Sequence, residues 1–130
     1  MVFFSTNVFA EKVNDIEISG NKRISKQTIL VLSSISKGDD LDPSKINNSI
    51  KKLYNSNFFK DIKFDLTNGK LKIDVIENPI IEDIEFTGIK SKEFTKKISE
   101  SMILKNRMSF TEDQLQKDIN LIKNILKANG

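Results

Sequence analysis

The sequence predicts an α+β fold: a two-layer β-α-α-β-β unit, in which two antiparallel helices cover a three-stranded mixed sheet, followed by a truncated second copy. Two observations predict it. The strand pattern of residues 15–20, DIEISG, returns at residues 83–88 as DIEFTG, and a repeat of this length is one small domain rather than a solenoid unit. In the first copy, two helix patterns and an Asn68-Gly69 hairpin signal follow the strand.

The first strand and the first helix have separate signals. Residues 13–19 alternate apolar and polar side chains, with Ile16 and Ile18 on one face, which predicts a half-buried strand. Ser25 is a suitable N-cap for a helix that reaches about Ser34. Its inward residues should be Ile29 and Leu32.

The second helix begins at Asp42-Pro43, with an acidic N-cap and a proline at the first helical position, where its missing N–H costs nothing. Leu41 before the cap and Ile46 in the first turn form a hydrophobic staple. Ile46, Ile50 and Leu53 then form one apolar stripe, so this helix should pack on the sheet through that stripe.

Two strands joined by a two-residue type I′ turn at Asn68-Gly69 complete the unit. The turn fixes the register. The apolar pairs are Leu66 with Leu71, Phe64 with Ile73 and Ile62 with Val75, and the charged pairs are Asp65 with Lys72 and Lys63 with Asp74. A slip of one residue would break both patterns, which makes this register specific.

The second unit repeats the order. We predict a strand over Ile80–Thr87, a helix after the N-cap Ser91 and a helix after the capping box of Thr111 and Gln114. The core positions expected in these helices are Phe94, Ile98, Met102, Leu115, Ile119, Ile122 and Leu126. No closing hairpin follows. We therefore expect less protection from hydrogen exchange in this half than in the first.

Composition limits the chemistry. The 130 residues contain no cysteine and no histidine, which excludes disulfides, thiolate or imidazole metal sites, and Ser-His or Cys-His nucleophiles. Asp39-Asp40 is interpreted as a solvated turn, because no calcium-binding spacing surrounds it. The remaining polar residues form no catalytic constellation. The sequence therefore predicts no catalytic residue, no cofactor and no metal, and a protein that is not an enzyme.

The N-terminus resembles the end of an export signal. Residues 1–10 are uncharged, and Val8 and Ala10 occupy the −3 and −1 positions of a cleavage site. A basic beginning is missing, so residues 1–10 are interpreted as the remnant of a signal peptide. No stretch has the roughly 20 apolar residues of a membrane-spanning helix.

Specific motifs occur along the chain: residues 16–24, IEISGNKRI, residues 57–62, NFFKDI, and the junction at residues 75–79, VIENP, followed by a second such strand motif, IEFTG. These segments resemble those of POTRA domains, the polypeptide-transport-associated modules of the BamA outer-membrane assembly family. The resemblance covers residue 13 to the C-terminus. It implies a first POTRA domain at residues 11–78 and an incomplete second one at residues 79–130, which lacks the closing β-hairpin.

The resemblance also implies a function. POTRA domains are non-catalytic periplasmic modules of outer-membrane proteins that receive unfolded outer-membrane proteins and dock chaperones and assembly lipoproteins. In the family's sheet the last strand is central, which leaves the strand before it at an edge, where an extended client can pair with the backbone. The partner-binding residues implied here are Lys60, Asp61, Ile62, Lys63, Phe64, Asp65 and Leu66. Lys63 and Asp65 could equally protect the edge against aggregation.

Two alternatives stay open. One is the POTRA region of a two-partner secretion or division protein, although the tandem copies and the V-x-E-x-P junction favour the BamA type. The other is a basic KH-like nucleic-acid module, since the net charge is +3. A KH fold needs a G-x-x-G loop, and neither Gly20 nor Gly38 has a glycine three positions on. The only arginines are Arg23 and Arg107, and the lysines are mixed with carboxylates.

Overall fold

The computed structural model describes residues 10–130, which divide into two compact units. The first unit ends at Glu77 and the second begins at Asn78. Apart from Ala10, the predicted signal-peptide remnant lies outside the described residues.

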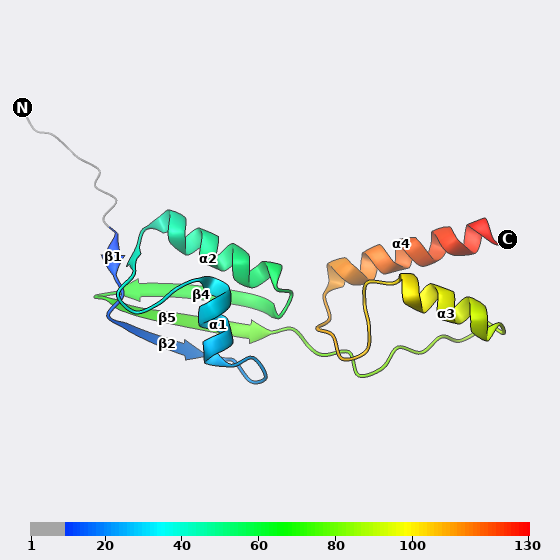
Figure 1. Cartoon of the computed structure of the whole chain (residues 1–130), viewed down its shortest axis with the longest axis horizontal. Coiled ribbons are helices and arrows are strands. Elements are labelled where there is room, and N and C mark those ends of the chain that lie inside the picture. The colour runs from blue at the N-terminus through cyan, green and yellow to red at the C-terminus, as the bar shows by residue number, and fades with distance from the viewer. Residues whose placement is uncertain (1–9) are drawn as a thin grey trace, which may run out of the picture. The chain divides into compact units, whose positions relative to one another are not determined.

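The first unit is a three-stranded mixed sheet with two helices on one side (Figure 1). Its strands are β2 (Asp15–Ser19), β4 (Phe59–Thr67) and β5 (Lys70–Glu77), in the order β2-β5-β4. The central strand β5 runs parallel to β2 and antiparallel to β4. This arrangement confirms the predicted α+β fold class and places β4 at an edge.

The helices α1 (Lys26–Ser33) and α2 (Pro43–Asn55) begin where the sequence predicts. Ser25 Oγ accepts from the Thr28 N–H at 3.0 Å, and Asp42 Oδ1 accepts from the Lys45 N–H at 2.7 Å. Apolar side chains from both helices and all three strands form one buried core. Its members are Val13, Ile18, Ile29, Ile35, Leu41, Leu53, Phe59, Ile62, Leu71, Ile73 and Val75.

The predicted hairpin register is confirmed at all five pairs, and Asn68 and Gly69 both have positive φ, as a type I′ turn requires. The register shifts between Phe59 and Asp61, so Lys60 lies in a β-bulge. The sequence gives no sign of this bulge, because the alternation of side chains is regular only from Ile62 onward.

A small second sheet was not predicted. It pairs β1 (Glu11–Lys12) with β3 (Asp40–Leu41). Asp40, interpreted from the sequence as part of a solvated turn, is therefore in a short strand, although it remains exposed. Asp39 Oδ2 accepts from the Ser36 N–H at 2.8 Å, so this carboxylate shapes the loop before β3.

The repeated glycine ends β2 with a close backbone approach. Gly20 has a φ of 85°, and a Cβ there would lie 2.0 Å from the Val75 carbonyl oxygen on β5. Its counterpart Gly88 has a φ of 82°, but nothing lies within 4 Å of a Cβ there. The two copies thus share the turn conformation but differ in what lies against it.

The second unit contains α3 (Lys92–Ser101) and α4 (Glu112–Ala128), and both predicted N-caps are confirmed. The strand prediction for Ile80–Thr87 is wrong in this structure. Only an isolated bridge joins Ile80 to Ser109. A hydrogen-bonded ladder needs a neighbouring strand. Within residues 10–130 no strand pairs with this segment, whereas the equivalent β2 pairs with β5. Ile81 instead bonds to the loop before α4, through the Met108 carbonyl and the Arg107 N–H.

Candidate functional site

The predicted partner-binding residues, Lys60 to Leu66, all lie on the edge strand β4. Thr67 and Lys70, on either side of the two-residue turn, form a hydrogen-bonded pair. From this pair onward, hydrogen-bonded and non-hydrogen-bonded pairs alternate along an antiparallel hairpin, and Ile62, Phe64 and Leu66 belong to the non-hydrogen-bonded pairs. Ile62, Phe64 and Leu66 therefore direct their N–H and C=O groups away from β5. Their side chains are buried or half-buried, whereas Lys63 and Asp65 are exposed.

The N-terminal half of this edge is not free, because Tyr54 at the end of α2 occupies it. The Tyr54 hydroxyl accepts from the Ile62 N–H at 3.1 Å and contacts Asp61 Oδ1 at 3.3 Å as donor. Lys60, next to this pair, lies in the bulge. Sequence reasoning missed Tyr54 as a site residue, although it is the only tyrosine in the chain and closely precedes the strand.

The C-terminal half of the edge is open. In the described part of the chain, no side chain or loop hydrogen-bonds to the outward N–H groups of Phe64 and Leu66. Thr67 Oγ1 donates to Asp65 Oδ1 at 3.1 Å, which is a contact on the face of the strand and not at its edge. The unpaired backbone groups that could receive an extended peptide are therefore those of Phe64 and Leu66.

The opposite edge, β2, borders a hollow of about 500 Å³ between this strand and α1. The lining residues are Ile16, Gln27, Leu30, Val31, Ser34, Ile35, Ser36 and Lys37. Val31 is an apolar side chain that is 66% exposed here. This hollow is the second place in the first unit where a partner could lie against a sheet edge.

Two exposed ion pairs flank β2. Lys37 Nζ lies 3.3 Å from Asp15 Oδ1, and Lys70 Nζ lies 3.0 Å from Glu17 Oε2. The hydrogen bond from Lys37 lowers the pKa of the Asp15 carboxyl, and the hydrogen bond from Lys70 lowers the pKa of Glu17. The same contact raises the pKa of Lys70. Both pairs are exposed, so solvent screens them strongly.

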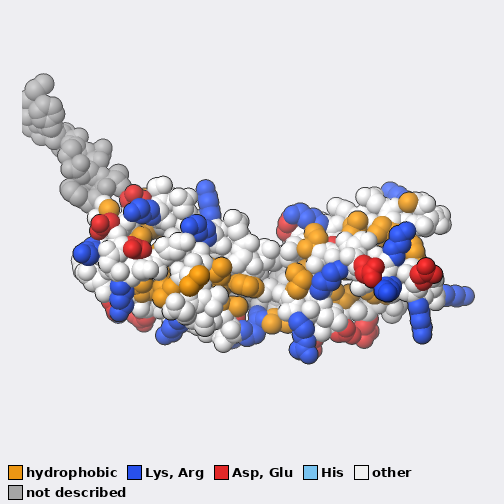
Figure 2. All heavy atoms as spheres, in the orientation of Figure 1, with side chains coloured by type: hydrophobic (Ala, Val, Ile, Leu, Met, Phe, Trp, Pro, Cys, Tyr) orange, Lys and Arg blue, Asp and Glu red, His pale blue; other side chains and the backbone are white. Residues whose placement is uncertain are grey.

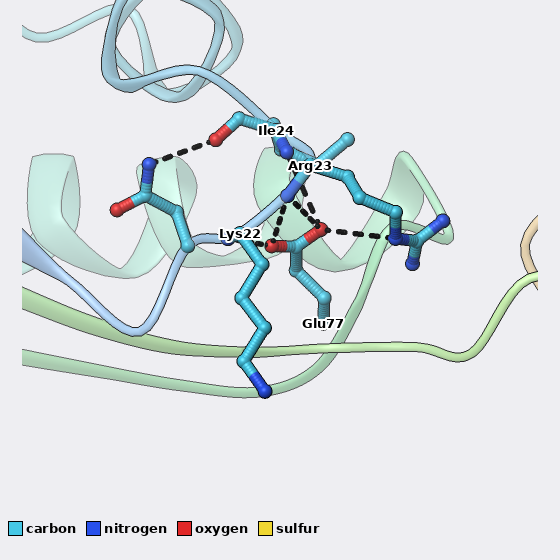
Figure 3. Close-up of polar contacts among 5 residues, drawn as sticks. Lys22, Arg23, Ile24 and Glu77 are labelled. Atoms are coloured by element: carbon cyan, nitrogen blue, oxygen red, sulfur yellow. Dashed lines mark hydrogen bonds and ion pairs between the residues drawn. The ribbon is translucent and has the colours of Figure 1, made fainter.

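Glu77, the glutamate of the V-x-E-x-P junction, binds the loop between β2 and α1 (Figure 3). Its carboxylate accepts from the backbone N–H groups of Lys22, Arg23 and Ile24, at 2.9 Å for Arg23 and 3.3 Å for Ile24. Arg23 Nε lies 3.7 Å from the same carboxylate, whose side chain is only 6% exposed. Sequence reasoning quoted this motif only as a mark of resemblance. In the structure it anchors a loop of the first unit.

Other site types receive no support from the described residues. Figure 2 shows lysine and carboxylate side chains interspersed on the visible face, without a continuous basic surface. Within residues 10–130, no three histidine, cysteine, aspartate or glutamate side chains lie close enough to hold a metal ion. None of the helices described there has the length and apolar character needed to cross a membrane.

The strand order β2-β5-β4, with two helices on one side of the sheet, defines a class of small α+β modules, and comparison with known families identifies this class. Residues 11–78 match the family model POTRA, described as surface antigen variable number repeat. The chain belongs to the POTRA family.

Relatives similar to this chain in sequence are assembly factors of the BamA type. The chain is 37% identical over 90 residues to the outer membrane protein assembly factor BamA of Neorickettsia risticii, covering 69% of this chain. It is 30% identical over 104 residues to that of Neisseria meningitidis, covering 80% of this chain. In both comparisons the match spans only 12% of the relative's length.

Two solved structures share the fold. The N-terminal domain of Omp85 from Thermosynechococcus elongatus matches with a TM-score of 0.61 at 15% identity, covering 92% of this chain and 52% of that one. POTRA1-2 of the periplasmic domain of Omp85 from Anabaena matches with a TM-score of 0.56 at 11% identity, covering 94% and 81%. At these identities the likeness concerns the fold alone.

Proposed function

We propose that the chain is a non-catalytic periplasmic module of a BamA-type outer-membrane protein assembly machine, which receives unfolded outer-membrane proteins by β-augmentation. Chaperones and assembly lipoproteins would dock on the same module. In this proposal residues 11–78 form one complete POTRA domain and residues 79–130 form part of a second. The observation that carries the proposal is the open stretch of β4, where Phe64 and Leu66 present unpaired backbone groups.

Backbone pairing suits a receiver of varied clients. An added strand bonds through N–H and C=O groups that every residue has, so its affinity depends little on sequence. The exposed neighbours Lys63 and Asp65 are charged, and charged side chains on an edge strand discourage permanent pairing with another copy. This edge therefore fits partners that bind in an extended form and are released again.

The test is a titration of the isotope-labelled chain with an eight-residue peptide of alternating valine and threonine, carrying two lysines at each end for solubility. We expect amide shifts at β4, concentrated at Phe64 and Leu66. Shifts confined to β2 and α1 would place the site at the hollow beside Ile16 instead. Binding to nucleic acid that weakens steeply with salt would favour the KH-like alternative.

A pair of variants at one position separates the backbone from the side chain. Phe64→Pro removes the outward N–H without removing a bond to β5, whereas Phe64→Ala removes the same ring and keeps the N–H. We expect the proline variant to lose peptide binding and the alanine variant to retain it. Equal binding by two folded variants, checked by amide exchange of β5, would exclude this edge.

A further inference from the structure

We propose that Tyr54 determines where on the β4 edge a partner strand can pair, an inference that rests on the proposed function. The Tyr54 hydroxyl occupies the N–H of Ile62, the first outward backbone donor after the bulge. A partner strand can pair at Phe64 and Leu66 without displacing a hydrogen bond of residues 10–130, but it reaches Ile62 only by replacing this hydroxyl. The partner's register and its length of pairing are set by this competition.

The geometry gives the hydroxyl a defined position. Tyr54 belongs to the last turn of α2, and its hydroxyl lies between a backbone donor and a carboxylate acceptor, Asp61 Oδ1, which lies 3.3 Å away. An acceptor with a negative charge orients the hydroxyl hydrogen, so the oxygen lone pairs face the Ile62 N–H. The two contacts together hold the tyrosine against the strand.

The tyrosine can also leave. Tyr54 is 40% exposed, and its hydrogen bond with the Ile62 N–H is only partly buried. A side chain at a helix end with this exposure can swing into solvent without opening the core. The hydroxyl therefore competes with a partner strand without closing the edge permanently.

Together with the bulge at Lys60, this contact gives the edge a blocked end and an open end. The open end lies next to the Asn68-Gly69 turn, and the blocked end lies next to α2. Pairing limited to the open end involves few backbone hydrogen bonds and is therefore weak. Such pairing suits a partner that must be released again. Full pairing along Lys60 to Leu66 would require the tyrosine to move and the bulge to accommodate the partner.

The test compares wild type with Tyr54→Phe, which keeps the ring and removes only the hydroxyl, using the Val–Thr peptide described above. One hydrogen bond no longer competes, so we expect the dissociation constant to fall by about 2- to 10-fold. We also expect the peptide-induced shifts, confined to Phe64 and Leu66 in wild type, to extend to Ile62. Asp61→Asn, which weakens the hold on the hydroxyl, should have a smaller effect in the same direction.

Thr67→Val is the matched control, because it removes a hydroxyl group on β4 itself. That hydroxyl donates to the Asp65 side chain and makes no bond at the edge of the strand. Its peptide affinity should equal that of wild type. If wild type binds the peptide at Phe64 and Leu66, and Tyr54→Phe has the same affinity and the same shift pattern, the proposed role of Tyr54 is wrong and the proposed function is unaffected. Absence of β4 shifts in every variant would instead overturn the proposed function.

Discussion

Ser49 and Asp118 occupy the same position of the repeat, 69 residues apart, and bind the end of the preceding helix with opposite polarity. Ser49 Oγ donates to the carbonyl of Ser33, the last residue of α1, at 2.8 Å. Asp118 accepts from the N–H groups of Ile103 and Leu104, just after α3, at 2.7 and 2.8 Å. Both side chains are buried. The copies have kept the contact between their helices while reversing its donor and acceptor.

The first prediction follows from Asp118. Asp118→Asn should destabilise the second unit by about 1–3 kcal/mol, because an amide nitrogen would face one of the two backbone N–H groups, of Ile103 (part-buried) and Leu104 (buried), that now donate to the carboxylate. Faster amide exchange at Ile103 and Leu104, together with a lower urea midpoint for amides of α4, would show it. Asp113→Asn on the same helix is the control. It loses only an exposed pair with Lys117 and should cost less than about 1 kcal/mol.

The second prediction concerns the junction glutamate. Glu77→Gln should cost the first unit about 1–3 kcal/mol, since one carboxylate oxygen is replaced by a donor that faces backbone N–H groups. Residue-resolved hydrogen exchange should become faster at Arg23 and Ile24. Glu82→Gln, an exposed change a few residues on, should leave these amides as they are. Unaltered exchange in Glu77→Gln would contradict the anchoring role.

The third prediction compares the repeated glycines. Gly20→Ala and Gly88→Ala meet the same unfavourable positive φ, which costs about 1–2 kcal/mol. Only Gly20→Ala also places a Cβ 2.0 Å from the Val75 carbonyl oxygen. We therefore expect Gly20→Ala to be clearly the more destabilising of the two in chemical denaturation. Equal losses of stability would mean that the close approach of β2 to β5 is not maintained in solution.

The fourth prediction is the pH dependence of the pairs beside β2. The pKa values of Asp15 and Glu17 are lowered in the folded chain, so their contribution to stability is present above their ordinary pKa values and is lost as the pH falls through the lowered ones. The pKa of Lys70 is raised, so its contribution is present below its ordinary value of 10.5 and is lost as the pH rises through the raised one. Carboxyl ¹³C titration should show the Glu17 pKa increase in Lys70→Met, with Asp15 much less affected.

Local signals were enough for much of the first unit. Ser25, Asp42 and Asn68-Gly69 act within four residues of themselves, so the helix starts and the hairpin register could be predicted. The absence of a strand at Ile80–Thr87 could not be predicted, because the alternation of side chains expresses a preference that is fulfilled only where a neighbouring strand is present. Tyr54 and Glu77 were missed for a similar reason: their partners, Ile62 and the loop at residues 22–24, are brought to them by the folded unit.

The Glu77 contact also fixes an order of events during synthesis. Ribosomes make the chain from its N-terminus, so the loop N–H groups of residues 22–24 are made 53 to 55 residues before the carboxylate that binds them. Glu77 is also the last residue of the first unit. The loop can therefore reach its final conformation only when the unit's final side chain has emerged, and a nascent chain stalled earlier would present that loop to proteases.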